Sequence, residues 1–151
     1  MFSTVQKNML NAFHYYGEKY PIHIGGILYL PKAYKDRLIE AIYHVTSDIE
    51  LLEYTLLNNT FVKTKQTLVI DELFDISAIQ SYFDKPFIEE TLLYRIGILI
   101  QKDNLLLISV FNHLISDSYS MNLFLHAVLS YISQKEVFEF NNNYDDFVKS
   151  E

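Results

Sequence analysis

Two apolar runs separated by a short polar segment constrain the fold of this chain more than any other feature. Residues 92–101 and 105–112 are mostly apolar, and residues 102–104 between them are Lys, Asp and Asn. Apolar runs joined by so short a polar link are typical of two antiparallel strands in the middle of a sheet. The sequence therefore predicts a central β-hairpin that forms the core of the sheet.

A helix with one apolar stripe is predicted directly after this hairpin. Apolar residues recur there at intervals of three and four, which places them on one side of a helix. These residues are Met121, Phe124, Leu125, Val128, Leu129 and Ile132. We expect the helix to begin near residues 116–118, with Ser116 or Asp117 as its N-cap, because both residue types accept hydrogen bonds from free backbone N–H groups.

The first ninety residues contain further helical and strand patterns. The pair Gly25-Gly26 permits a bulge or a close backbone approach in the first strand, and Asn58-Asn59 is a turn signal between the next two. Together the elements predict a single domain over residues 1–151, an α/β sandwich in which helices cover a mixed or antiparallel sheet. Helices are predicted over residues 3–16, 33–46 and 76–83, and strands over 22–30, 51–57 and 67–70.

Composition excludes several classes of function. The chain has 12 Lys and Arg against 19 Asp and Glu, and lacks the basic cluster that a nucleic-acid surface needs. It has no Cys, which excludes disulfides, thiolate catalysis and cysteine-based zinc sites. His14, His23, His44 and His126 lack the spacing of metal ligands, so we expect no metal site. We find no signal peptide and no apolar run that would span a membrane, and we expect a soluble, cytoplasmic protein.

The turn between the predicted hairpin and the last helix carries the residues suited to chemistry. The strand ends at Asn112-His113, and Asp117 follows four residues after His113. Strand-to-helix turns present side chains to a cleft, and an imidazole titrates near neutral pH, which suits a general base. A His at the end of an apolar strand is, taken alone, more often a structural residue, so this pattern leaves both interpretations open.

This segment resembles the condensation-domain family of nonribosomal peptide synthetases, in the chloramphenicol acetyltransferase-like superfamily. The family signature is two adjacent His, three residues, Asp and Gly, between an apolar strand and a helix; residues 112–118 here read NHLISDS. Residues 85–133 resemble the family's run from a Pro-Phe turn to the motif helix, and 24–28, 38–57 and 144–148 resemble further segments. The resemblance covers nearly the whole chain but only the N-terminal half of a family domain, which implies that the second lobe is absent.

The resemblance implies roles for His113 and Asp117. His113 matches the second His of the signature, which in the family positions or deprotonates the attacking amine or hydroxyl group. Asp117 matches the Asp, which in the family is mainly structural and pairs with an Arg to hold the His loop. Arg37 and Arg95 are the two arginines that this chain offers as partners.

Three positions depart from the family pattern. Asn112 stands in the place of the first His, which is compatible with activity because the second His carries the chemistry. Ser118 replaces the Gly, and a residue with a Cβ resists backbone shapes that Gly adopts. Glu53 lies in the region where the family usually has an Arg.

Two functions follow from the resemblance, and the sequence leaves both open. In the first, this lobe supplies His113 for amide or ester formation between carrier-bound thioesters, and a second lobe, a separate chain or another copy completes the site. The acyl groups would arrive on the phosphopantetheine arms of carrier proteins, and the chain itself would bind no cofactor. In the second, the chain is an inactive, truncated lobe that docks a carrier protein or a neighbouring synthase subunit.

Overall fold

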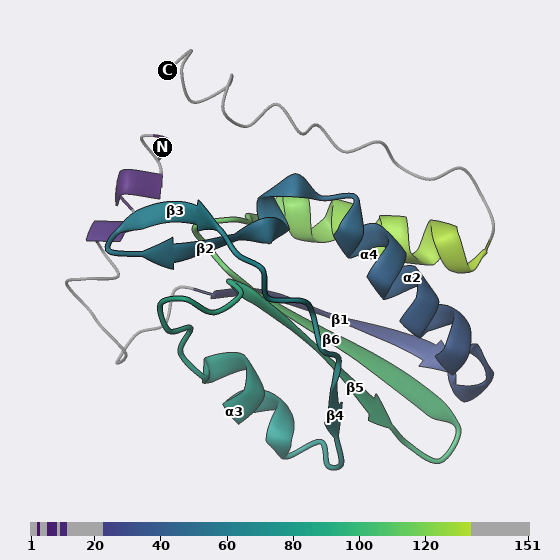
Figure 1. Cartoon of the computed structure of the whole chain (residues 1–151). Helices are drawn as coiled ribbons and strands as arrows, with labels where there is room; N and C mark the ends of the chain where they lie inside the picture. Colours follow the sequence, from purple (N-terminus) through teal and green to yellow (C-terminus); the bar gives the residue numbers. More distant parts are fainter. Residues whose placement is uncertain (1–2, 4–5, 9, 12–22, 134–151) are drawn as a thin grey trace.

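Helices cover both faces of one four-stranded sheet. The computed structural model describes residues 3, 6–8, 10–11 and 23–133. Helices α2 and α4 pack on one face of the sheet and α3 on the other, which confirms the predicted α/β sandwich (Figure 1). The strands are β1 (His23–Pro31), β2 (Tyr54–Leu57), β3 (Thr60–Lys63), β4 (Asp71–Leu73), β5 (Tyr94–Ile100) and β6 (Asn104–Asn112). The α-helices are α2 (Lys35–Ser47), α3 (Ala78–Asp84) and α4 (Ser118–Ile132), and the 3-10 turns η2 (Lys32–Tyr34) and η3 (Glu50–Glu53) flank α2.

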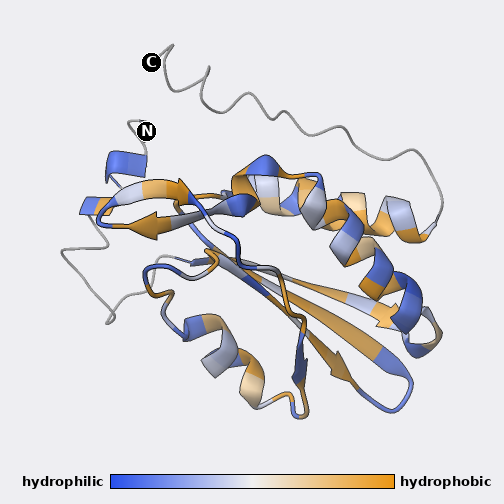
Figure 2. Ribbon diagram, in the orientation of Figure 1, coloured by the Kyte–Doolittle hydropathy of each residue, from blue (hydrophilic) through white to orange (hydrophobic). Residues whose placement is uncertain are grey.

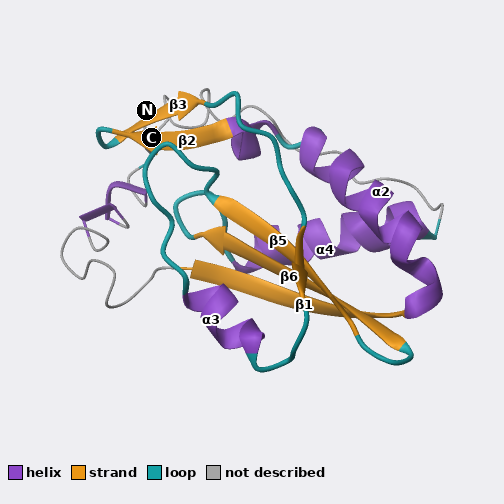
Figure 3. Ribbon diagram, turned by 60° about the horizontal axis from the view of Figure 1, so that its bottom comes forward, coloured by secondary structure: helices purple, strands orange, loops and turns teal. Residues whose placement is uncertain are grey.

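The β5–β6 hairpin forms the middle of this sheet, as predicted. The strand order is β1-β6-β5-β4 (Figure 1), in which β6 is antiparallel to both neighbours and β4 is parallel to β5. Figure 3 shows β1, β6 and β5 side by side. Every residue of β6 after Asn104 is buried, and Figure 2 shows both hairpin strands as largely hydrophobic. The sheet is therefore mixed, and β6 is its most buried strand.

The glycine pair in β1 serves close packing. The pairing of β1 with β6 runs without interruption from His23–Asn112 to Pro31–Asn104, so β1 contains no bulge. A Cβ at Gly25 would lie 2.3 Å from a ring carbon of Phe83 in α3, and one at Gly26 would lie 2.8 Å from Leu125 in α4. Of the two predicted uses of the pair, the structure therefore shows the close approach, on both faces.

The Asn58-Asn59 turn is confirmed, but the strands around it differ from those predicted. Both residues have positive φ, 48° and 59°, which is typical of a tight two-residue hairpin. The turn joins β2 to β3, which directly follows it, and the strand predicted over 67–70 is wrong because those residues lie outside any strand. The strand predicted over 51–57 begins only at Tyr54, where η3 ends.

The two long helices bury the apolar stripes that their spacing predicts. In α2 the buried apolar residues are Leu38, Ala41, Ile42 and Val45. In α4 they are Met121, Phe124, Ala127, Val128 and Ile132. Leu125 and Leu129 of the predicted stripe are only half-buried, and Ala127 takes a fully buried place instead.

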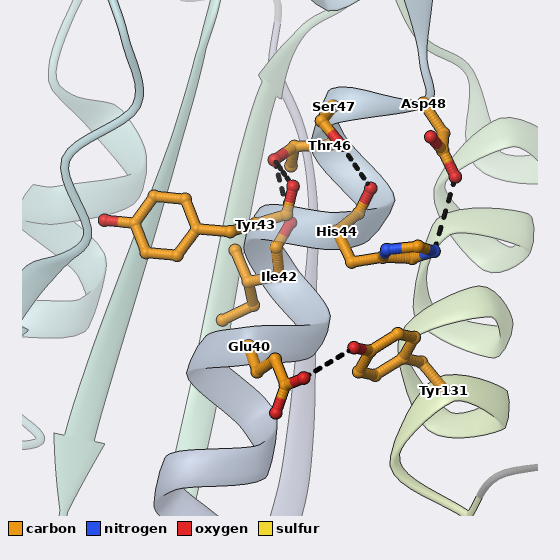
Figure 4. A network of polar contacts seen from close by, with 8 residues as sticks. All are labelled: Glu40, Ile42, Tyr43, His44, Thr46, Ser47, Asp48 and Tyr131. Atoms are coloured by element: carbon orange, nitrogen blue, oxygen red, sulfur yellow. Dashed lines mark hydrogen bonds and ion pairs between the residues drawn. The ribbon is translucent and has the colours of Figure 1, made fainter.

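Polar contacts connect α2 and α4 beside this core. The Tyr131 hydroxyl donates to Glu40 Oε1 at 2.8 Å, and its ring centroid lies 4.6 Å from that of His44 (Figure 4). Within α2, the buried Thr46 hydroxyl donates to the Ile42 carbonyl at 2.7 Å. This hydrogen bond satisfies the hydroxyl group although it is shielded from water. These contacts help to fix how the two helices lie against each other.

The ends of the chain are only partly described. Residues 6–8 and 10–11 are helical, within the helix predicted over 3–16. Ser3 lies outside the helix, and residues 4–5, 9 and 12–16 of that prediction lie outside the described residues. The segment 144–148, which resembles a family segment, and His14 also lie outside them. In the described part of the chain, every helix is too short or too polar to cross a membrane.

Candidate functional site

His113 lies on a loop whose backbone is held by hydrogen bonds. It directly follows β6 and is half-buried. The buried side chain of Asn112 accepts a hydrogen bond from the Leu114 N–H at 3.0 Å, and the Asn112 carbonyl accepts one from the Ile115 N–H at 3.0 Å. The Asn112 N–H in turn donates to the Leu93 carbonyl at 2.8 Å. Asn112 therefore shapes the turn that presents His113.

Asp117 caps the helix that follows the loop, as predicted. Its backbone is extended, and its Oδ1 accepts a hydrogen bond from the Ser120 N–H at 2.7 Å. This hydrogen bond, with a smaller contribution from the charge of His113, lowers the pKa of Asp117. Ser118 is exposed and begins α4 without a positive φ, so the backbone here does not need the Gly of the family pattern.

Neither arginine pairs with Asp117 in the described part of the chain. Arg37 is exposed on α2, and no ion pair joins it to Asp117. Arg95 is half-buried on β5, where its guanidinium carbon lies 4.1 Å from the Phe87 ring centroid and one of its amino groups donates to the Lys85 carbonyl. Burial lowers the pKa of Arg95. Neither arginine therefore holds the loop through Asp117.

Glu53 takes part in an exposed ion pair with a residue of the β2–β3 hairpin. Its carboxylate lies 3.2 Å from Lys63 Nζ, and the carboxylate of Glu50 lies 3.6 Å from the same nitrogen. Lys63 belongs to β3, which pairs only with β2 in a separate small sheet. The residue at this departure from the family pattern therefore serves the surface of the small hairpin.

Comparison with known proteins identifies the fold. No protein-family model matches the sequence, and the search of curated proteins found no match. The structure is similar to the tallysomycin biosynthesis protein TlmII, with a TM-score of 0.77, 16% identity, and coverage of 95% of this chain and 38% of that chain. It is also similar to a structure that concerns condensation domain-mediated chain release from the enacyloxin polyketide synthase, with a TM-score of 0.73, 16% identity, and coverage of 98% and 33%.

A variant of the starter condensation domain of the rhizomide synthetase RzmA gives a TM-score of 0.75 at 12% identity, with coverage of 99% of this chain and 43% of that chain. This chain has the condensation-domain fold. The resemblance seen in the sequence is confirmed at the level of the fold. The chain spans 38%, 33% and 43% of the three similar chains, so it corresponds to one lobe of a condensation domain.

Two residues that the sequence did not indicate as parts of the site adjoin the His113 loop. Gln6 is buried, and its side-chain amide donates to the Leu114 carbonyl. His23 pairs with Asn112 across β1 and β6; its Nδ1 lies 2.8 Å from the Phe83 carbonyl, and burial lowers its pKa. Both contacts join segments distant in sequence, so no local pattern indicates them.

A cavity of about 400 Å³ opens at the same end of the condensation-domain sheet. Arg95 and Tyr94 of β5 line it, and Tyr94 pairs with Phe111 of β6 just before the His113 loop. His113 is not among the described lining residues. In the described part of the chain, no group of three or more His, Asp or Glu side chains is placed to hold a metal ion.

Proposed function

We propose that this chain is a condensation-domain lobe that takes part in acyl transfer, with His113 as the general base. The reaction is amide or ester formation between carrier-bound thioesters. The observation that carries the proposal is the half-buried His113 at the end of the central strand, on a loop held by Asn112 and followed by the Asp117 helix cap. Such pre-organisation is what a general base needs.

His113 would take the proton of the attacking group in this reaction. As the amine or hydroxyl of the acceptor forms its bond to the thioester carbonyl carbon, the imidazole accepts the proton that this group loses. The carbon–sulfur bond then breaks, and the proton passes to the departing thiolate. That thiol is the end of the phosphopantetheine arm of the donor carrier protein, so the arm belongs to the substrate.

A second surface is needed to complete such a site. His113 is only half-buried, and a thioester beside it would stay open to water unless another surface covered it. We propose that this surface is a second lobe, supplied by a longer parent protein, by a separate chain or by another copy of this chain. The coverage of only 38% of TlmII supports this arrangement.

The departures from the family motif are compatible with activity. Asn112 uses its side chain to hold the turn, and Ser118 fits the start of α4 without strain. A lobe that only docks a carrier protein would have no need of an imidazole on a loop whose backbone is held in this way. We therefore favour the catalytic role and treat docking without transfer as the competing outcome.

The test is product formation by the purified chain, alone and mixed with a separately produced second lobe. An acyl-loaded carrier protein and an amine-bearing acceptor are incubated with wild type, His113→Ala, and the matched control His126→Ala, whose residue is exposed on α4. Mass spectrometry follows the amide. We expect product from wild type and His126→Ala and its loss in His113→Ala. Carrier binding without product in any protein would contradict the catalytic role and support docking.

A further inference from the structure

The Gln6 contact is the one long-range hydrogen bond to a carbonyl of the His113 loop that we find in the described part of the chain. Gln6 is 7% exposed, and its side-chain Nε2 donates to the carbonyl of Leu114, 108 residues away along the chain. Leu114 directly follows His113 and is itself only 3% exposed. A buried carbonyl without a partner would be costly, so this amide determines where the Leu114 peptide can lie.

Gln6 is itself held in place by its own segment. The Ser3 N–H donates to Gln6 Oε1 at 3.0 Å, and the Gln6 N–H donates to Ser3 Oγ at 3.2 Å. This reciprocal pair is a capping box, which starts the helical segment and orients the amide. Because Ser3 occupies the Gln6 oxygen, the NH₂ group remains to face the loop.

Leu10 anchors the same face of this segment in the core. It lies four residues after Gln6, on the same side of a helix, and is 9% exposed. Lys7 and Asn8 between them are exposed. The segment therefore presents one apolar anchor and one amide donor to the domain.

Asn112 and Gln6 both bind the backbone of Leu114, the residue directly after His113. The Asn112 side chain accepts the Leu114 N–H, and the Gln6 side chain donates to the Leu114 carbonyl. We propose that Gln6 is a positioning residue, which fixes the carbonyl of Leu114 and so, through the backbone of the residue next to His113, sets the direction of the imidazole. This inference rests on the proposed role of His113 in acyl transfer.

The test compares Gln6→Ala and Gln6→Glu with the matched control Gln80→Ala. Gln80 also donates its side-chain amide, to Asp84 Oδ2 at 2.8 Å, but on the exposed surface of α3. With the second lobe present, we expect kcat to fall about five-fold or more in both Gln6 variants while the KM for the acceptor is unchanged, the factor expected for one lost hydrogen bond. Gln80→Ala should keep the wild-type kcat.

A second readout works whether or not the protein is active. Imidazole resonances are recorded by NMR over a pH series, and that of His113 is assigned by its loss in His113→Ala. We expect the His113 resonance to shift in both Gln6 variants, with those of His44 and His126 unchanged, and no shift in Gln80→Ala.

The outcomes separate this inference from the proposed function. An inactive wild type would contradict the proposed function, yet the His113 resonance would still test the inference. An unchanged His113 resonance in folded Gln6→Ala or Gln6→Glu would overturn it. If all histidine resonances collapse in both variants, Gln6 is a general stability residue and the inference fails as well.

Discussion

The two faces of the four-stranded sheet are packed in different ways. The face under α2 and α4 is apolar and closed, since Leu38, Val45 and Phe124 are at most 1% exposed. The face under α3 includes Arg95 and His23, both only half-buried. A seven-residue helix covers less of a sheet than two long helices do, so polar side chains remain tolerable on that face.

The face that contributes most to stability is therefore not the face that carries the titratable side chains. Burial on the α2 and α4 face even raises the pKa of the Tyr94 hydroxyl to about 12, so that side chain stays neutral. On the α3 face, burial lowers the pKa of both His23 and Arg95 without removing them from solvent. We infer that the long helices supply most of the folding energy, and that the opposite face and the His113 loop hold the titratable groups.

The largest expected effect is a cavity under the long helices. Phe124 is 1% exposed and its ring centroid lies 5.2 Å from that of Phe111, so Phe124→Ala should cost about 3–5 kcal/mol of unfolding free energy. Phe83→Ala on the α3 face should cost about 1–2 kcal/mol because Phe83 is only partly buried. Urea unfolding of both variants measures the difference. Equal losses of unfolding free energy in the two variants would mean that the two faces contribute equally to stability.

The loop at the end of the central strand should contribute less. Asp117→Ala removes the N-cap of α4 and should cost about 1 kcal/mol. Asp117→Asn keeps an acceptor oxygen and should retain most of that stability. The exposed Glu89→Ala, outside any helix and compared by urea unfolding, serves as the control. A loss of the same size in all three variants would mean that the cap does not stabilise the loop.

A single polar contact on the α3 face should have a similar or smaller effect. The Tyr82 hydroxyl donates to Asp71 Oδ2 at 2.8 Å, and burial raises the pKa of Tyr82. Tyr82→Phe should lose about 0.5–1.5 kcal/mol, the net value of one hydrogen bond. Thermal unfolding should show no change for Tyr119→Phe, since Tyr119 is 72% exposed. An unfolding temperature in Tyr82→Phe equal to that of wild type would show that this hydrogen bond does not stabilise the α3 face.

The smallest expected effect is on the pH dependence of stability. Burial holds the pKa of His23 below 6.5, so the unfolded chain binds a proton at this residue more readily than the folded protein does. The contribution of His23 is therefore fully present above the unfolded pKa and is lost as the pH falls through that value toward the folded pKa. His23→Gln should make unfolding free energy less steep between about pH 5 and pH 7.5. If unfolding free energy changes with pH in His23→Gln as steeply as in wild type, the pH dependence comes from other groups.

Local signals in the sequence were sufficient for the hairpin, the long helices and the helix cap at Asp117. The β5–β6 hairpin shows in two apolar runs around a polar link, and Asp117 directly precedes the helix that it caps. The Asn58-Asn59 turn was also recognisable, because two residues with positive φ favour Asn. Each of these features depends on residues close together in the chain.

The remaining features depend on contacts between distant segments. β4 is three residues long and exists only because Asp71–Leu73 pairs with β5, so no period in the sequence marks it. The prediction of a strand over 67–70 was wrong for the same reason, because β-propensity does not determine which residues pair with a neighbouring strand. Gln6 reaches the His113 loop across 108 residues, which no spacing rule reveals.

The central claim is that His113 serves chemistry and not stability. The most direct measurement pairs the single-turnover acyl-transfer rate of His113→Ala, with the second lobe present, with its urea unfolding midpoint. The account predicts a rate lower by about 100-fold or more, the usual contribution of a general base, and an unchanged midpoint. A His113→Ala protein that transfers the acyl group at the wild-type rate, or that loses the rate only because it unfolds, would contradict it.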